Sequence, residues 1–163
     1  MQLTFAAVTK LFPDMKQIET IASAAHFTAV DLGPLEGLGD YELALGGGLR
    51  IAGKIFGGAA VGATGAEFSL QRFAAGSEAG FLHTHKNHEE LYFVLAGAGE
   101  FRVDDRIFPV REGSVVRVAP AGRRTLRNNG SAPLTVLCIQ YRSATFTAED
   151  AADYTILDEA VRW

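Results

Sequence analysis

Between residues 49 and 142, short apolar runs alternate with clusters of Gly, Pro, Asn and Asp. These turn residues break the chain too often for helices that could connect parallel strands. Many short strands at close spacing are typical of an all-β sandwich or barrel. The expected strands are Leu49–Phe56, Ala66–Ala74, Phe81–His85, Glu90–Leu95, Glu100–Val103, Ile107–Val110, Val115–Val118, Arg124–Arg127 and Leu134–Tyr141.

The length of 163 residues suits one domain, which we divide into three parts. Residues 1–48 are expected to form an N-terminal extension that packs on the barrel or on a partner subunit, residues 49–142 the β-barrel, and residues 143–163 a C-terminal extension. Apolar residues at helical intervals predict a short helix at Asp14–Ala25. A short strand is expected near Tyr41–Leu45, a loop at Gly57–Ala66, and a brief helix after the capping-box spacing at Thr147–Asp150.

Composition restricts the possible partners and compartment. The net charge of −4, with both signs spread along the chain, disfavours a surface that binds nucleic acid or anionic membrane. The single cysteine, Cys138, cannot form an internal disulfide or a four-cysteine zinc site. No apolar run approaches the ~20 residues of a membrane-spanning helix, and the first ten residues do not resemble a signal peptide. We therefore expect a cytoplasmic protein.

Two histidines and a glutamate form the clearest candidate site. Side chains two apart on a strand share a face, so His83 and His85 are expected to project together. A tight turn over residues 86–89 would then place Glu90 opposite them, on an antiparallel strand. Two imidazoles and one carboxylate suit a divalent ion such as Zn, Fe, Mn, Ni or Co, and leave coordination positions for water or substrate.

This run resembles the first motif of the cupin superfamily, which reads His-x-His, three or four residues, Glu, six residues, Gly. Counting back from Gly97 selects Glu90 over Glu89 as the ligand. The resemblance covers about residues 66–142 and implies an all-β double-stranded β-helix, also called a jelly roll or cupin barrel. It also implies a divalent metal ion at His83, His85 and Glu90.

The segment Gly113–Asn129 resembles the second cupin motif. Pro120-Ala121-Gly122 matches its Pro-x-Gly, and Asn129 falls at its closing position. Thr125 stands where metal-binding cupins usually have the histidine that completes three His and one Glu. The resemblance therefore implies a site reduced to two His and one Glu, a set like the facial triad of non-haem iron oxygenases.

Arginines cluster around the second motif. Four arginines fall within eleven residues, and a fifth precedes the first motif. A guanidinium at the barrel mouth could hold a phosphate or carboxylate through two hydrogen bonds. The candidate substrate-binding residues are Arg72, Arg123, Thr125 and Arg127.

The sequence does not decide which face of the strand these arginines occupy. Strand alternation places Arg123, Thr125 and Arg127 together. Arg124 then points the other way. If the shared face is the outer one, the arginines would instead pair with nearby acidic residues, because one bulge reverses the parity of a strand. These acidic residues are Asp104, Asp105 and Glu112.

The function expected from these features is metal-dependent binding or isomerisation of a small anionic metabolite such as a sugar phosphate. Glu90 or Tyr92 would move the proton, although Tyr92 could equally be packing inside the barrel. Two alternatives are an Fe(II)-dependent dioxygenase and a non-catalytic ligand-binding or sensing cupin. Whether the protein is an enzyme is left open. A homodimer is expected, because the apolar first fifty residues lie outside the minimal barrel.

Overall fold

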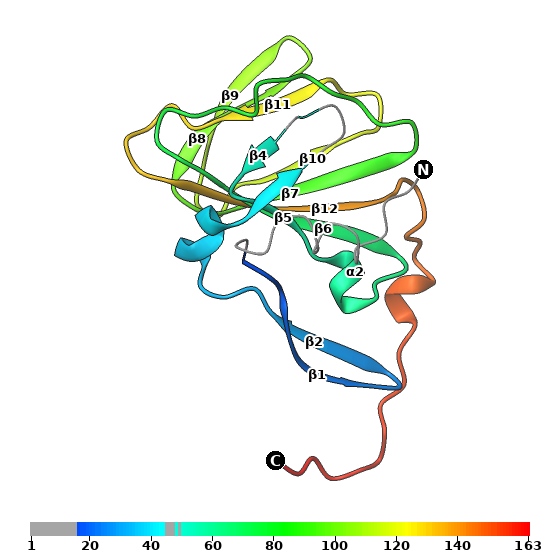
Figure 1. Cartoon of the computed structure of the whole chain (residues 1–163). Helices are drawn as coiled ribbons and strands as arrows, with labels where there is room; N and C mark the ends of the chain where they lie inside the picture. Colours follow the sequence, from blue (N-terminus) through cyan, green and yellow to red (C-terminus); the bar gives the residue numbers. More distant parts are fainter. Residues whose placement is uncertain (1–15, 45–47, 49) are drawn as a thin grey trace.

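Two antiparallel sheets face each other and form the barrel (Figure 1). The structure, a computed structural model, describes residues 16–44, 48 and 50–163. One sheet has the order β10-β7-β12-β6-β5, and the other has the order β11-β8-β9. The all-β double-stranded β-helix expected from the sequence is confirmed. The strands are β5 (Lys54–Phe56), β6 (Ala66–Phe73), β7 (His88–Ala96), β8 (Ala98–Val103), β9 (Arg106–Arg111), β10 (Val115–Val118), β11 (Arg124–Arg127) and β12 (Leu134–Arg142).

The larger sheet presents rows of side chains to the barrel interior. Strand β12 lies between β6 and β7, so residues on the three strands align in register. One interior row runs through Ser69, Cys138 and Tyr92. The next row contains Gln140 and Glu90. Polar groups therefore occupy neighbouring positions on a surface that water reaches poorly.

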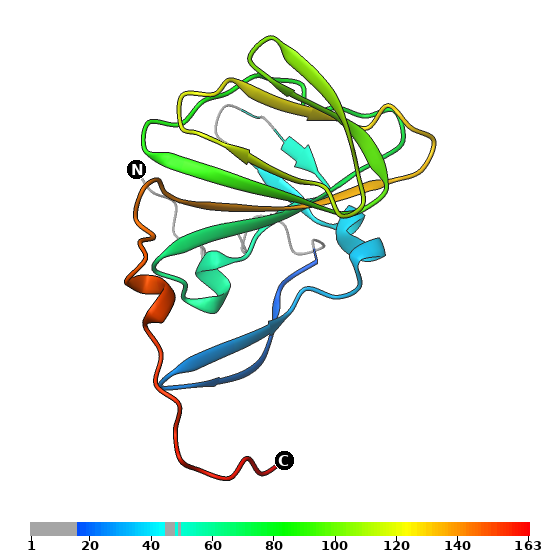
Figure 2. The same cartoon turned by 180° about the vertical axis from the view of Figure 1, so that it is seen from behind.

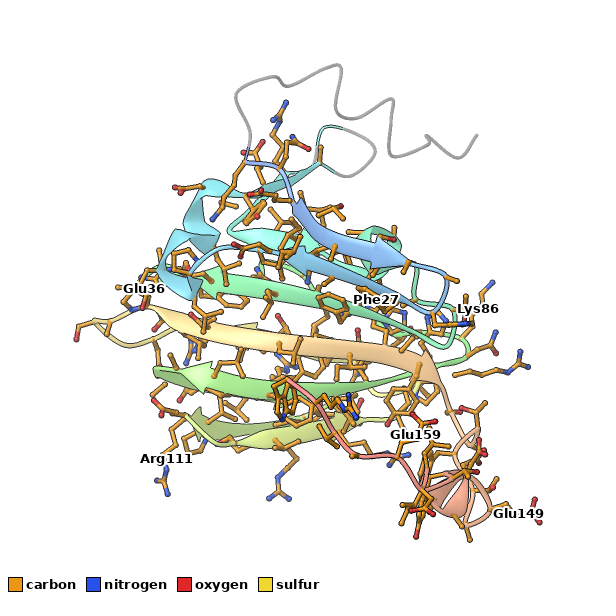
Figure 3. The ribbon with its side chains drawn as sticks, turned by 90° about the horizontal axis from the view of Figure 1, so that it is seen from below. Phe27, Glu36, Lys86, Arg111, Glu149 and Glu159 are labelled. Atoms are coloured by element: carbon orange, nitrogen blue, oxygen red, sulfur yellow. The ribbon has the colours of Figure 1, made fainter. Side chains whose placement is uncertain are left out.

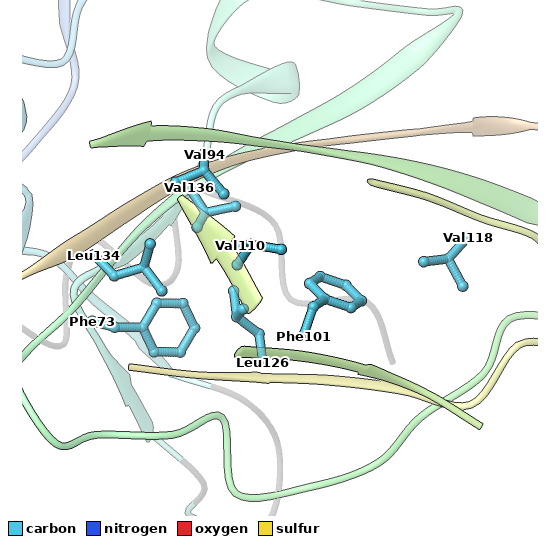
Figure 4. Packing of buried hydrophobic residues seen from close by; sticks show 8 residues of the cluster. All are labelled: Phe73, Val94, Phe101, Val110, Val118, Leu126, Leu134 and Val136. Carbon is cyan, nitrogen blue, oxygen red and sulfur yellow. The ribbon is translucent and has the colours of Figure 1, made fainter. Parts of the chain in front are cut away.

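A hydrophobic core fills the space between the sheets at one end of the barrel (Figure 4). The residues come from both sheets, so their burial holds the two layers together. Polar residues gather at the other end, and this division positions the candidate site. The core residues are Phe73, Val94, Phe101, Val110, Val118, Leu126, Leu134 and Val136.

The segment before the barrel forms strands rather than the predicted helix. Strand β1 (Glu19–Ala24) pairs with β2 (Phe27–Asp31) in a hairpin, so the helix prediction is wrong over residues 16–25, and the rest of it lies outside the described residues. Three apolar residues fitted a helical period, but so short a run does not distinguish helix from strand. The hairpin lies beside the short helix α2 (Gly58–Val61) and projects away from the barrel (Figures 1 and 2).

A second apolar cluster covers the outer face of the larger sheet. It joins Leu38 and Tyr41 to Leu70 of β6. The 3₁₀ helix η1 (Leu35–Asp40) supplies Leu38, and β3 (Glu42–Ala44) follows and pairs with β4 (Arg50–Ala52). The strand expected near Tyr41–Leu45 is thus present in its described part.

Four other predicted elements differ from the structure. In its described part, the strand expected at Leu49–Phe56 is divided at Gly53 into β4 and β5, which belong to different sheets. The loop predicted at Gly57–Ala66 contains α2, and the brief C-terminal helix is the 3₁₀ helix η3 (Asp150–Ala152), whose Asp150 accepts hydrogen bonds from Thr147. Phe81–His85 is not a continuous strand, because only His83 forms a β-bridge there, to Arg124. No helix in the described part of the chain is long and apolar enough to cross a membrane.

Candidate metal and anion site

Glu90 is the centre of the polar end of the barrel. It lies on β7 and is 1% exposed. Its Oε1 accepts hydrogen bonds from Gln140 at 2.7 Å and from His85 Nε2 at 3.1 Å. Its Oε2 accepts from the Tyr92 hydroxyl at 2.6 Å and from Arg124 Nε at 2.7 Å. A carboxylate with four such donors is held in one orientation.

The two histidines reach Glu90 from a different element than expected. The His83 backbone exchanges hydrogen bonds with that of Arg124, at 3.1 and 3.3 Å, and the His85 amide donates to the Pro120 carbonyl at 2.9 Å. The segment is therefore attached to β11 and to the loop before it. The predicted hairpin between residues 81–85 and β7 is wrong, because β7 pairs with β10 and β12 instead.

The three expected metal ligands nevertheless converge. One potential ligand atom from each of His83, His85 and Glu90 lies within 4.8 Å of the others. His83 Nε2 is 3.9 Å from Glu90 Oε2, and the two imidazole ring centres are 5.3 Å apart. Side-chain exposures of 35% for His83 and 25% for His85 leave this face of the site open.

Arg124 is a site residue that the sequence did not single out. It is fully buried, and its guanidinium lies against Glu90. Its Nη1 donates to the carbonyls of Pro120 and Gly122, whereas Nη2 is buried without a hydrogen-bond partner among the described residues. The arginine therefore compensates the charge of Glu90 and retains one unused donor.

A one-residue offset explains this difference. The sequence motif aligned Thr125 and Asn129 with the histidine and asparagine positions, but Arg124 and Asn128 are the buried pair. Both pairs are four residues apart and so share a strand face equally well. Asn128 donates to the carbonyls of Phe73, Ala74 and Ala132, as expected of an inward residue at the end of β11. Arg124, not Thr125, occupies the inward position of the second motif.

The electrostatics of the site favour a charged carboxylate beside a neutral His83 imidazole. Burial would raise the pKa of Glu90, but hydrogen bonds from Tyr92, Gln140 and Arg124 outweigh it and lower that pKa to about 2. Burial lowers the pKa of His83, although the negative charge of Glu90 opposes this effect. At neutral pH, His83 is therefore unprotonated and able to offer a lone pair to a metal ion.

Neither nearby hydroxyl nor thiol ionises readily. Burial, together with the negative charges around it, raises the pKa of Tyr92. Burial and the adjacent Glu90 raise the pKa of Cys138 to about 12, and its Sγ lies 3.6 Å from Glu90 Oε1. Both groups thus act as hydrogen-bond donors that fix Glu90.

The donor set fits a divalent metal ion. Two ligands bound to one ion at about 2.1 Å lie roughly 3.0–3.4 Å apart, and the 3.1 Å between His85 Nε2 and Glu90 Oε1 falls in this range. Gln140, Tyr92 and Arg124 would remain bound to the carboxylate as outer partners, an arrangement that orients ligands in metal sites generally. His83, His85 and Glu90 would hold the ion and leave positions for other ligands.

The three predicted ligand-binding arginines do not gather at this site. Arg123 lies on the surface and pairs with Asp104 and Asp105, and Arg127 pairs with Glu100. This arrangement matches the outer-face alternative for Arg123. Arg72 follows Gln71 on β6, so it lies on the other face of the strand, and it lines a neighbouring surface hollow.

Beside the histidines, a cavity of about 60 Å³ enters the barrel. Thr125 lines it together with His83 and Tyr92. Most of the wall area is apolar, from residues of both sheets, but seven polar or sulfur-bearing side chains also line it. The polar and sulfur-bearing lining residues are Lys54, Ser69, Gln71, His83, Tyr92, Thr125 and Cys138.

The barrel is similar to known proteins in both sequence and structure. Residues 69–140 match a family model described as a cupin domain. A cupin protein from Bacteroides fragilis has a similar solved structure, with a TM-score of 0.57 and 27% sequence identity over 74% of this chain and 95% of that one.

Two curated proteins are similar over shorter segments. An uncharacterised protein of Methanocaldococcus jannaschii is 35% identical over 60 residues, which are 37% of this chain and 48% of that one. An oxalate-binding protein of Thermotoga maritima is 28% identical over 72 residues, which are 44% of this chain and 59% of that one. The chain thus spans about half the length of the curated relatives it matches.

Proposed function

Because residues 69–140 form a small domain of the cupin superfamily, we propose that this protein binds a divalent metal ion in its barrel and, through it, a small carboxylate anion. The observation that carries the proposal is the convergence of His83, His85 and Glu90 within 4.8 Å. A bound ion would supply positive charge and open coordination positions for the oxygens of the anion.

Charge balance supports an anionic ligand. Arg124 adds a positive charge where a complete cupin site would have a neutral histidine. Glu90 neutralises Arg124, so the two positive charges of the metal would remain uncompensated. A buried excess of charge is costly, and an anion that binds the metal would relieve it. The unused Nη2 donor of Arg124 adds to this positive environment.

The cavity favours a small anion. A water molecule needs roughly 10–15 Å³ of such volume, so a cavity of about 60 Å³ matches an acid of two to four carbons. A sugar phosphate is larger than this. The similarity to a protein named for oxalate binding agrees with the smaller class of ligand.

Binding without turnover is the form of the proposal that the hydrogen bonds favour. Glu90 has a pKa of about 2 and all its donors in place, so it is a weak proton acceptor. The raised pKa of Tyr92 makes it a weak proton donor. The isomerase role predicted for Glu90 and Tyr92 needs a group that exchanges protons readily near neutral pH, and neither residue provides one.

A second candidate, an Fe(II)-dependent dioxygenase, is favoured by the ligand set of two histidines and one carboxylate. Oxygen consumption by iron-loaded protein with a small carboxylic acid would support it. Unchanged oxygen levels, with the acid shown to bind, would argue against it.

The experiment that tests the proposal is metal titration of the untagged, chelator-stripped protein. We expect one equivalent of Zn²⁺ or Mn²⁺ by calorimetry, and oxalate binding that depends on the metal. His83→Ala and His85→Ala should abolish stoichiometric metal binding. His88→Ala is the matched control, because this exposed imidazole lies close to His85 but outside the converging set. Failure of the wild-type protein to bind metal, or oxalate binding unaffected by its removal, would overturn the proposal.

A further inference from the structure

Lys54 lines the same interior cavity as His83. We infer that Lys54 is a second anion-binding group, which holds the far carboxylate of the ligand and makes the site selective for small dicarboxylates over monocarboxylates. This inference rests on the proposed function, because the metal would hold the near carboxylate. It assigns a role to a residue outside the metal-ligating cluster.

The strand register directs Lys54 into the barrel. Lys54 pairs with Gln71 of β6, and Gln71 pairs with Val136 of β12, so the three share the interior face of the larger sheet. Val136 belongs to the hydrophobic core, which confirms that this face points inward. The neighbouring interior row contains Cys138 and Tyr92, which line the same cavity. Lys54 therefore enters the cavity from the sheet edge opposite β10.

Lys54 has no carboxylate partner among the residues that the structure describes. Its Nζ donates to the neutral Gln71 side chain at 3.3 Å, and it lies over the Phe56 ring, 5.3 Å from the ring centroid. Glu90, the buried carboxylate of the candidate metal site, is already paired with Arg124. The cavity therefore contains a positive charge that the described protein groups do not neutralise.

Desolvation makes this charge costly without a ligand. Burial lowers the pKa of Lys54, although the negative charge of Glu90 opposes the effect. An anion bound at the ammonium group would compensate the charge and form a charge-assisted hydrogen bond. The buried charge of Lys54 thus destabilises the ligand-free protein and, for the same reason, strengthens the binding of an anion.

The size of the cavity limits the ligand to a short molecule. An acid of two to four carbons fits about 60 Å³, and one with two carboxylates presents a negative charge at each end. One carboxylate can bind at the metal and His83 side while the other meets Lys54. A monocarboxylate of the same length leaves Lys54 without a counter-ion.

The test compares malonate with lactate, two three-carbon acids of which only malonate carries a second carboxylate. Calorimetry on zinc-loaded protein should show wild type binding malonate at least about tenfold more tightly than lactate, as expected for one added charged hydrogen bond. Lys54→Met should lose about tenfold or more in malonate affinity and change lactate affinity less than about threefold. Lys54→Arg should retain the preference.

Two further measurements separate a binding role from a structural one. Lys54→Met should bind zinc as wild type does, and without ligand it should melt at an equal or higher temperature, because a buried charge is removed. Lys86→Met is the matched control: Lys86 is exposed at the bend after His85 (Figure 3) and should change neither selectivity nor melting. Unchanged malonate preference in Lys54→Met would overturn the inference alone, whereas no zinc binding or no acid binding in wild type would overturn the proposed function.

Discussion

Arg124 sets the charge at the centre of the barrel. Its guanidinium contacts Glu90 through Nε at 2.7 Å and stands at the inward position of the second cupin motif. A fixed cation beside a metal ligand weakens binding of a divalent ion through charge repulsion. The protein thus combines a candidate metal-ligand set with a residue that would limit affinity for the bare metal and would favour a metal bound together with an anion.

Arg124→His should convert the site into a complete set of three imidazoles and one carboxylate. We expect zinc affinity to rise by at least about tenfold, because a neutral ligand replaces a repelling charge. Competition with a chromophoric chelator measures this change. Arg123→His, one residue away on the surface, should leave zinc affinity at the wild-type value; equal affinities for the two variants would contradict this role of Arg124.

Removing the charge of Arg124 without replacement should destabilise the fold. In Arg124→Met, Glu90 remains buried without its ionic partner, and breaking such a pair costs about 3–5 kcal/mol. Denaturant unfolding of the metal-free variant measures the loss. Arg123→Met should cost less than about 1 kcal/mol, because its ion pairs are exposed. A loss in Arg124→Met no larger than that of this control would contradict the expectation.

The ionisation of Glu90 should make the folding stability of the protein depend on pH. Its pKa of about 2 in the folded protein lies below its ordinary value of 4.5, so the unfolded chain takes up a proton first as the pH falls. The stabilisation, about 3 kcal/mol, is fully present above pH 4.5 and is lost as the pH falls towards 2.

Unfolding of metal-free protein between pH 6 and 2 tests this dependence. Wild type should lose more stability over this range than Glu90→Gln, which has no titrating carboxyl at this position. The difference between the two curves isolates Glu90 from other acidic groups. Parallel curves would show that Glu90 does not contribute this dependence.

The sequence predicted the residues of the metal set but not their surroundings. His83, His85 and Glu90 follow from one local spacing, and the structure brings them together. Arg124 and Gln140 come from strands far away in the sequence, and their approach to Glu90 depends on register. No local pattern contains this information.

At the level of elements, the turns between residues 97 and 130 defined the strands well. Gly97, for example, has a φ of +82°, and a side chain there would meet the Pro133 carbonyl, so the chain must turn between β7 and β8. Strand β11 spans Arg124–Arg127, as predicted. The sequence nevertheless left its orientation open, because a shift of one residue in the preceding loop exchanges the two faces of a strand.

Asn128 should be important where Asn129 is not. The buried amide of Asn128 donates to three backbone carbonyls and so ties the ends of β6 and β11 together. Asn128→Ala leaves these acceptors without their donor and should cost about 2–4 kcal/mol of unfolding free energy, measured by denaturant titration. Asn129→Ala, at an exposed position, should change stability by less than about 0.5 kcal/mol. Equal effects would contradict the register seen in the structure.

At the scale of the whole molecule, the barrel is covered more completely than the segments outside it. Every residue of β1 is exposed, and β1 pairs only with β2 among the described residues. A two-stranded hairpin is marginally stable by itself in water, and an unpaired strand edge invites another strand. The exposed Ile21 of β1 and Phe27 of β2 add apolar surface to this hairpin.

We propose that the expected homodimer forms at the β1–β2 hairpin, where β1 of one copy would pair with β1 of the other about a two-fold axis. Light scattering at micromolar concentration should give twice the mass of one chain. Ile21→Asp should shift the protein towards monomer, because it places a charge in the shared sheet. Ile107→Asp is the matched control, since Ile107 is similarly exposed, at 58% against 66%, but lies on β9 in the other sheet. A wild-type monomer, or equal dissociation in both variants, would contradict an interface at the hairpin.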